Sequence, residues 1–127
     1  LNIDLAPTFL DLAGVPAPAH YQGRSLLPLW RGETPMPWRD HIFIEHLMEH
    51  DRIRKHEGVR TTRFKYTRYF EAVPVLEELY DLATDPGETT NLINHHDFQA
   101  VAEDLRELTR RDVRTYETAR SERHATL

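Results

Sequence analysis

The chain has 127 residues, of which 39% are hydrophobic, and its formal net charge is −5. This length suffices for one compact domain with a core and is too short for two ordinary domains. An acidic chain without a clustered excess of Lys and Arg suits neither nucleic acid nor an anionic membrane, so we expect neither partner. The absence of Cys excludes disulfides, thiolate metal sites and a Cys nucleophile within these residues.

The sequence shows no targeting or membrane-spanning segment. Its apolar runs are too short to cross a bilayer, and its start lacks the charged, apolar and small-residue regions of a signal peptide. No Asn-x-Ser/Thr sequon occurs, which favours a bacterial cytoplasm or periplasm over a glycosylated lumenal compartment. Because Leu1 already lies at the approach to an expected helix, we expect the chain to be a fragment of a longer protein.

The first expected element is a short amphipathic helix over residues 2–13. Asp4 is placed to cap its N-terminus, and Gly14 and Pro16 end it. Its apolar stripe consists of Leu5, Phe9, Leu12 and Ala13.

A proline-stiffened connector follows this helix. Residues 16–20 are expected to be extended, and Ser25 can cap a single helical turn within the following stretch, residues 22–30. Residues 32–38 contain two prolines and indicate a linker into the next part of the chain.

Strands are expected at residues 41–47, 58–62, 64–69 and 76–82. The first is nearly continuous in apolar character, which predicts a central strand covered on both faces. The next two strands alternate between polar and apolar residues and are joined by a tight turn. Residues 48–56 are charged and predict a loop. Tyr66, Tyr69 and Tyr80 are expected to pack under a helix.

The segment after the last strand contains a turn and several acids. Asp85-Pro86-Gly87 predicts a chain reversal in which Gly87 supplies a positive φ. The acids Asp81, Asp85 and Glu88 do not follow the ligand order of an EF-hand, so we interpret them as turn and strand residues rather than a calcium loop.

The C-terminal part predicts one long helix from about Asp97 to residue 119, lying across the sheet. Its stripe at helical spacing is interrupted only by Asp112. The stripe consists of Phe98, Val101, Leu105, Leu108 and Tyr116. Residues 120–127 lose this periodicity and are expected to form a disordered tail.

Four strings of this chain, in the same order, resemble the C-terminal region of type I sulfatases of the alkaline-phosphatase-like superfamily. They are D-L-A-P-T-F-L-D-L-A-G-V-P, G-R-S-L-L-P-L, G-V-R-T-x-R-F-K-Y and E-E-L-Y-D-L-x-x-D-P-G-E-x-x-N-L. The resemblance is to the C-terminal domain of enzymes such as N-sulfoglucosamine sulfohydrolase and the arylsulfatases, which use a formylglycine nucleophile.

This resemblance implies an α+β fold: a small antiparallel sheet of about four strands packed by one long C-terminal helix, preceded by a short helix that belongs to a missing catalytic domain. Residues 1–38 would be the tail end of that catalytic domain and a linker. Residues 39–119 would be the sulfatase C-terminal subdomain, and residues 120–127 the tail.

The resemblance also implies hydrolysis of a carbohydrate or aryl sulfate ester by the parent protein. Its nucleophile derives from a C/S-x-P-x-R motif, which is absent here. Formylglycine and calcium are therefore implied for the parent and no cofactor for this chain. We expect this portion to be structural and pocket-shaping, inactive alone, with the catalytic domain and a sulfated small molecule or glycan as its partners.

Three residues are candidates for contact with substrate. The resemblance places the strand that ends near His46 beside the mouth of the active site. Arg60 and Lys65 could meet anionic sugar substituents, although residues on alternating strands are commonly the solvated face of a sheet. The neighbouring histidines His41, His46, His50 and His56 could hold a metal, but their spacing matches no ligand motif.

Two other functions stay open on the sequence. The chain could be a stand-alone interaction or sugar-binding module, or part of a phosphatase or phosphonate hydrolase of the same superfamily. A fragment would leave the stripe of Leu5, Phe9 and Leu12 poorly covered or docked on a second copy, whereas a module would bury it.

Overall fold

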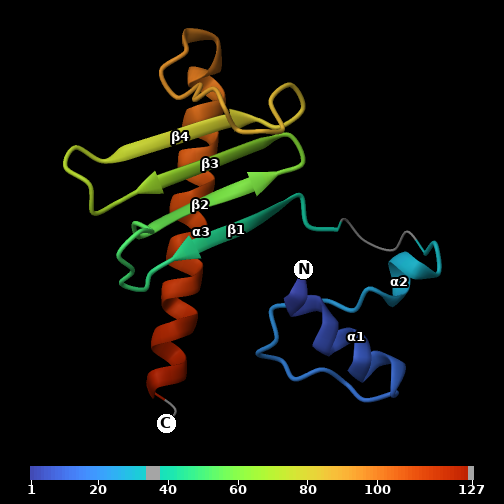
Figure 1. Ribbon diagram of the computed structural model, residues 1–127. Coiled ribbons are helices and arrows are strands. Elements are labelled where there is room, and N and C mark those ends of the chain that lie inside the picture. The colour runs from blue at the N-terminus through green and yellow to red at the C-terminus, as the bar shows by residue number, and fades with distance from the viewer. Residues whose placement is uncertain (34–37, 126–127) are drawn as a thin grey trace. The chain divides into compact units, whose positions relative to one another are not determined.

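The computed structural model describes residues 1–33 and 38–125, and from residue 119 onward its backbone alone. The chain divides into two compact units, Leu1–Trp38 and Arg39–Leu127, which are each described by themselves (Figure 1). Part of the predicted linker, residues 34–37, and the last two residues of the predicted tail lie outside the described residues.

The first unit contains three short helices: η1 (Asn2–Asp4), α1 (Leu5–Leu12) and α2 (Leu27–Trp30). Gly14 has a φ of 70°, a left-handed conformation that ends α1 as predicted. Ser25 accepts a hydrogen bond from the backbone N–H of Leu27 at 3.2 Å, but the N-cap of α2 is Leu26, which makes no side-chain capping bond, so the expected Ser25 cap is not formed.

Asp4 is buried and does not cap α1 through its side chain, contrary to the sequence interpretation. Its carboxylate accepts a hydrogen bond from the backbone N–H of Arg24 at 2.9 Å, and the hydroxyl of Thr8 accepts one from Leu26 at 2.9 Å. Two buried polar side chains therefore fasten the connector against the start of the unit. Gly23 is required there, because a Cβ would lie 1.9 Å from the carbonyl oxygen of Ile3.

The second unit contains an antiparallel four-stranded sheet in the order β1-β2-β3-β4. The strands are β1 (His41–His46), β2 (His56–Thr61), β3 (Phe64–Tyr69) and β4 (Leu76–Asp81). One row of directly opposed residues crosses the sheet from Phe43 through Val59 and Tyr66 to Leu79. Because side chains alternate along a strand, this row lies on a single face.

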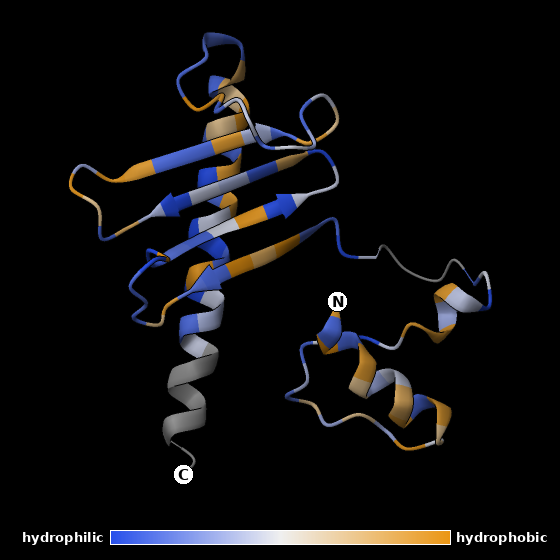
Figure 2. Cartoon of the chain, viewed as in Figure 1, coloured by the Kyte–Doolittle hydropathy of each residue, from blue (hydrophilic) through white to orange (hydrophobic). Residues whose placement is uncertain are grey.

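The position of β1 corrects the sequence prediction of a central strand. Among the described residues β1 pairs with β2 alone, so it is an edge strand. Figure 2 shows a hydrophobic stretch along this strand and a hydrophilic end at its arrowhead. Phe43 stacks on Tyr116 at 5.1 Å between ring centroids, whereas Ile42 and Ile44 point to the other face and are half-buried. The apolar run is thus shared between a helix-covered face and one that no helix of this unit covers.

A single long helix covers the face of the sheet that carries Phe43, Val59, Tyr66 and Leu79 (Figure 1). After the short helix η2 (His96–Phe98), α3 runs over Gln99–Ala125, past the end predicted near residue 119. Together with Val59, Tyr66 and Leu79 of the sheet, the buried core contains Ile93, Ala102 and Leu105. This sheet-and-helix arrangement confirms the predicted α+β class.

Of the three tyrosines expected under the helix, Tyr66 alone lies there. It is fully buried on the face that meets α3, and its hydroxyl donates a hydrogen bond to Glu77 at 2.5 Å. Tyr69 and Tyr80 lie on the opposite face of the sheet and are half-buried. The prediction failed for these two because it did not follow the strict alternation of side chains along β3 and β4.

The reversal after β4 also differs from prediction, because the positive φ of 55° belongs to Glu88 and not to Gly87. The Asp85 carboxylate accepts the backbone N–H groups of both Thr89 and Thr90 at 2.8 Å, which closes the turn. These hydrogen bonds hold the pKa of Asp85 below its usual value. The carboxylate of Glu88 meets the ammonium group of Lys65 at 2.5 Å.

Candidate functional site

We call the face of the sheet opposite α3 the open face. Along each strand, side chains of the open face alternate with those of the core face. The open face includes His46, Arg60, Lys65, Tyr69, Glu78 and Tyr80. No described helix of this unit covers the open face, which carries charged, imidazole and phenol groups.

All three candidates from the sequence lie on the open face, but at different ends of the strands. Arg60 and Lys65 are directly opposed on β2 and β3. Lys65 forms its ion pair with Glu88, whereas Arg60 is exposed. His46 ends β1 opposite His56, which begins β2. The structure therefore groups Arg60 with Lys65, and His46 with the loop that joins β1 to β2.

His46 is held in an unusual environment for an imidazole. Its Nε2 is buried and has no hydrogen-bond partner among the described residues. Its ring stacks on His56 with centroids 5.7 Å apart and approaches His50 at 6.3 Å. A buried polar atom without a partner costs free energy, so the surroundings of His46 are incomplete in these residues.

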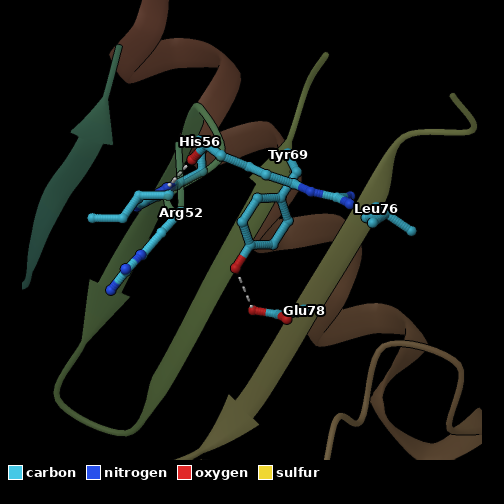
Figure 3. Close-up of a pocket in the computed structure, with 7 residues that line it drawn as sticks. Arg52, His56, Tyr69, Leu76 and Glu78 are labelled. Atoms are coloured by element: carbon cyan, nitrogen blue, oxygen red, sulfur yellow. Dashed lines mark hydrogen bonds between the residues drawn. The ribbon is translucent and has the colours of Figure 1, made fainter. Parts of the chain in front are cut away.

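Beside this histidine group lies a cavity of about 380 Å³, which we call the loop pocket. The β1–β2 loop supplies Arg52, Ile53 and Arg54, and the strands supply His56, Tyr69, Leu76 and Glu78. In Figure 3, Tyr69 lies between Arg52 and Leu76 and points its hydroxyl at Glu78. The pocket thus combines cationic, aromatic, apolar and carboxylate groups.

Hydrogen bonds order the walls of the loop pocket. The backbone N–H of Arg52 donates to Nδ1 of His50 at 3.1 Å, and Nδ1 of His56 donates to the carbonyl of Arg54 at 2.9 Å. The hydroxyl of Tyr69 donates to Glu78 at 3.0 Å. Burial and this carboxylate raise the pKa of Tyr69 to about 12, so the phenol is neutral near pH 7.

Sequence reasoning missed the loop pocket, because residues 48–56 indicated only a charged loop. Arg52 and Arg54 follow no motif. A possible signal was the alternation of Arg with Ile53 next to a strand that begins with His56, since such a loop can close over the end of a sheet.

The described residues do not fit the calcium site of a sulfatase. The one group of three potential ligands among them is His95, His96 and Asp97, which are exposed and offer two imidazoles and a single carboxylate. Calcium takes about six to eight oxygen ligands, which this group cannot supply. Nor does the chain contain the C/S-x-P-x-R motif that carries formylglycine.

The acids near β4 have protein partners of their own. Asp81 is buried and accepts hydrogen bonds from the Arg63 guanidinium at 2.7 Å and from the backbone N–H of Ala83 at 3.1 Å. The arginine holds the pKa of Asp81 below its usual value. Asp85 accepts the hydrogen bonds that close the turn, and Glu88 meets Lys65. None of the described helices has the length and apolar character needed to cross a membrane.

The four strings and the sheet with its single long helix together define a class: a C-terminal α+β unit of an alkaline-phosphatase-like hydrolase. Comparison with known proteins gives the family. Residues 1–114 match the family described as N-sulphoglucosamine sulphohydrolase, C-terminal. The chain belongs to this family.

The relatives are sulfatases several times longer than this chain. It is 34% identical over 121 residues to an N-acetylglucosamine-6-O-sulfatase of Bacteroides thetaiotaomicron, a match that covers 91% of this chain and 21% of the relative. A solved structure described as a complex with its substrate D-glucosamine-2-N,6-O-disulfate superposes with a TM-score of 0.82 at 31% identity, covering 92% of this chain and 24% of that one.

A phosphonate monoester hydrolase of Agrobacterium radiobacter has the same fold, with a TM-score of 0.64 and 26% identity over 94% of this chain and 24% of that one. The chain therefore spans between a fifth and a quarter of the length of each of these three proteins. Likeness in this region extends to a second kind of hydrolase.

Proposed function

We propose that this chain is the C-terminal part of a sulfatase that hydrolyses a sulfate ester of a carbohydrate, and that it shapes the substrate pocket without supplying the nucleophile. The observation that carries this proposal is the match of residues 1–114 to a sulfatase C-terminal family, in a chain that spans 21% of a 6-O-sulfatase. An aryl sulfate is the other ester class compatible with the family resemblance.

In this proposal the nucleophile and the metal belong to the longer part of the protein. When present, formylglycine would supply the nucleophile and calcium would offset the charge of the sulfate group, and residues outside this chain would hold both. The described residues offer neither group, so their contribution is to bind and orient the sugar. Residues 1–38 are, in this account, the end of the catalytic domain and its linker.

His46 is the residue of this chain that we place at the substrate. Its buried Nε2 has no partner in the described residues, and a sugar hydroxyl or the catalytic part would complete its hydrogen bonding. Arg60 and Lys65 lie opposite each other on the open face and carry positive charge, and Lys65 forms an ion pair with Glu88. Both cations are proposed to meet anionic substituents of the glycan.

The exposed apolar stripe on α1 favours contact with a catalytic domain of the same polypeptide over contact with a second copy of this chain. Leu5, Phe9 and Leu12 are 49%, 66% and 56% exposed. Apolar patches of this kind mark an interface. Because about four-fifths of the relative's length lies outside this match, the catalytic domain of the same protein is the occupant that we propose.

The test compares two ester classes on the longer protein that contains this chain. We expect release of sulfate from glucosamine 6-O-sulfate with a kcat/KM at least about a hundredfold above that for a phosphonate monoester, because the site would be shaped for a sulfated sugar. Preferential hydrolysis of the phosphonate would instead support the second kind of hydrolase.

The same assay tests His46. The variant His46→Ala should raise KM for the sulfated sugar by about tenfold, the value of one lost hydrogen bond in a desolvated site. His20→Ala is the matched control, because His20 is exposed and its one ring contact among the described residues is with Tyr21. Equal kinetic constants for both variants would remove His46 from the substrate pocket.

A further inference from the structure

The two arginines of the loop pocket differ from most cations of the sheet unit. Lys55, Arg63, Arg68 and Arg106 each form an ion pair with a carboxylate. Arg52 and Arg54 are exposed, and neither guanidinium forms an ion pair with any described carboxylate. Two unneutralised guanidinium groups two residues apart at one cavity attract an anion, and their planar donors match a sulfate or carboxylate.

The rest of the loop pocket suits a sugar. The side chains of Ile53, Tyr69 and Leu76 provide apolar surface, and Ile53 and Leu76 are each 45% exposed. Glu78 has one oxygen engaged by the Tyr69 hydroxyl at 3.0 Å and retains acceptor capacity for further donors. A pyranose ring has an apolar C–H face and hydroxyl donors, which these two kinds of surface would contact.

From these contacts we propose that the loop pocket binds a sugar bearing an anionic substituent, a sulfate or a carboxylate, other than the sulfate that is hydrolysed. Arg52 and Arg54 contact the anion, Glu78 accepts a sugar hydroxyl, and Tyr69 packs against the ring. At about 380 Å³ the cavity has room for a single sugar, since ligand pockets typically span ~300–1,000 Å³.

This inference rests on the proposed sulfatase function and adds a specificity site to it. The loop pocket adjoins His46, because His56 both lines the pocket and stacks on His46 at 5.7 Å. A substrate with a second anionic group, such as a disulfated glucosamine, could therefore contact both places. The cavity beside Arg60 at the other end of the open face is smaller, about 170 Å³, and is a weaker candidate.

The experiment is a ¹H–¹⁵N NMR titration of the 127-residue chain with glucosamine-2-N,6-O-disulfate and, separately, with uncharged N-acetylglucosamine. We expect the disulfate to shift the amide signals of the loop pocket and to bind more tightly than the uncharged sugar. In the double variant Arg52→Ala/Arg54→Ala, its dissociation constant should rise by at least about tenfold, as for lost charge-assisted hydrogen bonds.

The matched control is Arg110→Ala/Arg114→Ala, which removes the same charge from exposed positions on α3. We expect its dissociation constant to stay within about twofold of the unaltered chain. Equal loss in both double variants would show unspecific charge attraction, and an absence of shifts in the loop pocket would overturn the site. Either result would leave sulfate release by the longer protein unaffected, so failure of this site is distinguishable from failure of the proposed function.

Discussion

Tyr66, Glu77 and Arg106 form the polar contact that joins the sheet to α3. The phenol donates to one oxygen of Glu77, and the guanidinium of Arg106 binds the same carboxylate through two hydrogen bonds of 2.8 Å. Burial and the neighbouring carboxylate raise the pKa of Tyr66, so the phenol stays protonated. Each polar group of the cluster therefore has a partner, as burial demands.

Replacing Tyr66 should be far more costly than replacing Tyr80, although both are tyrosines of the same sheet. Tyr66→Ala removes a fully buried ring and should lower the free energy of unfolding by about 3–5 kcal/mol. Tyr80→Ala removes a half-buried ring from the open face and should cost about 1 kcal/mol. Urea denaturation of both variants measures the difference, and equal costs would contradict the assigned faces.

Glu77 should make stability depend on pH in the acid range. The hydrogen bonds from Arg106 are the main reason that the pKa of Glu77 lies below its ordinary value of 4.5 in the folded chain. A depressed carboxylate pKa stabilises the fold above the unfolded value, and this contribution is lost as pH falls from about 4.5 through the folded value. Glu77→Gln should therefore lower the free energy of unfolding at pH 7, and should lower it much less at pH 3, where the unaltered chain has already lost this contribution.

Urea denaturation at the two pH values measures this effect. The control is Glu103→Gln, which changes an exposed carboxylate on α3. Its effect on unfolding should be small at both pH values, because exposed ion pairs contribute little. If Glu77→Gln lowered the free energy of unfolding equally at pH 3 and pH 7, Glu77 would not be a source of the dependence of stability on acid pH.

At the scale of elements, β2 and β3 approach closely at Gly58. A Cβ there would lie 2.0 Å from the carbonyl oxygen of Tyr66, so Gly58→Ala forces the strands apart and should cost about 1–3 kcal/mol. Gly87 is the matched control, since its added Cβ would meet no atom closer than 3.5 Å and its φ is not positive. Similar thermal unfolding midpoints for Gly58→Ala and Gly87→Ala would contradict this packing.

Elements could be predicted from the sequence where local pattern determines them, and not where distant contacts do. The alternation in β3 and the helical stripe of α3 are local; β3 occurs over the predicted residues, and α3 occurs as predicted except that it continues past residue 119. In the sequence, Asp112 is a polar interruption of the apolar stripe. In the structure, its carboxylate meets Nε2 of His41 at 3.0 Å, although the two residues are 71 positions apart. The edge position of β1 also depends on which strand pairs with it.

The candidate site was predictable only in part for the same reason. The strings that resemble sulfatases gave the family, because they combine turn and packing residues whose order is specific. His46, Arg60 and Lys65 were placed correctly on a strand each, but the grouping of His46 with His56 depends on strand register. Arg52 and Arg54 became visible only when the loop was seen beside Tyr69 and Glu78.

In the whole molecule, two apolar surfaces lack a covering element among the described residues of their own unit: the stripe on α1 and one face of β1. The α1 stripe exposes Phe9 to 66%, and β1 presents Ile42 and Ile44 on a face that no described helix of its unit covers. Both surfaces are explained if a catalytic domain accounts for the length that the relatives have and this chain lacks. Both surfaces fit the proposed role, in which this chain supports catalysis by the longer protein without supplying the nucleophile.

Sulfate release from 4-nitrophenyl sulfate in the presence of calcium tests this proposed role, with the 127-residue chain and the longer protein assayed side by side. We expect the longer protein to release sulfate and to contain a C/S-x-P-x-R motif outside these residues, and the 127-residue chain to release none. Measurable turnover by the 127-residue chain alone would contradict it.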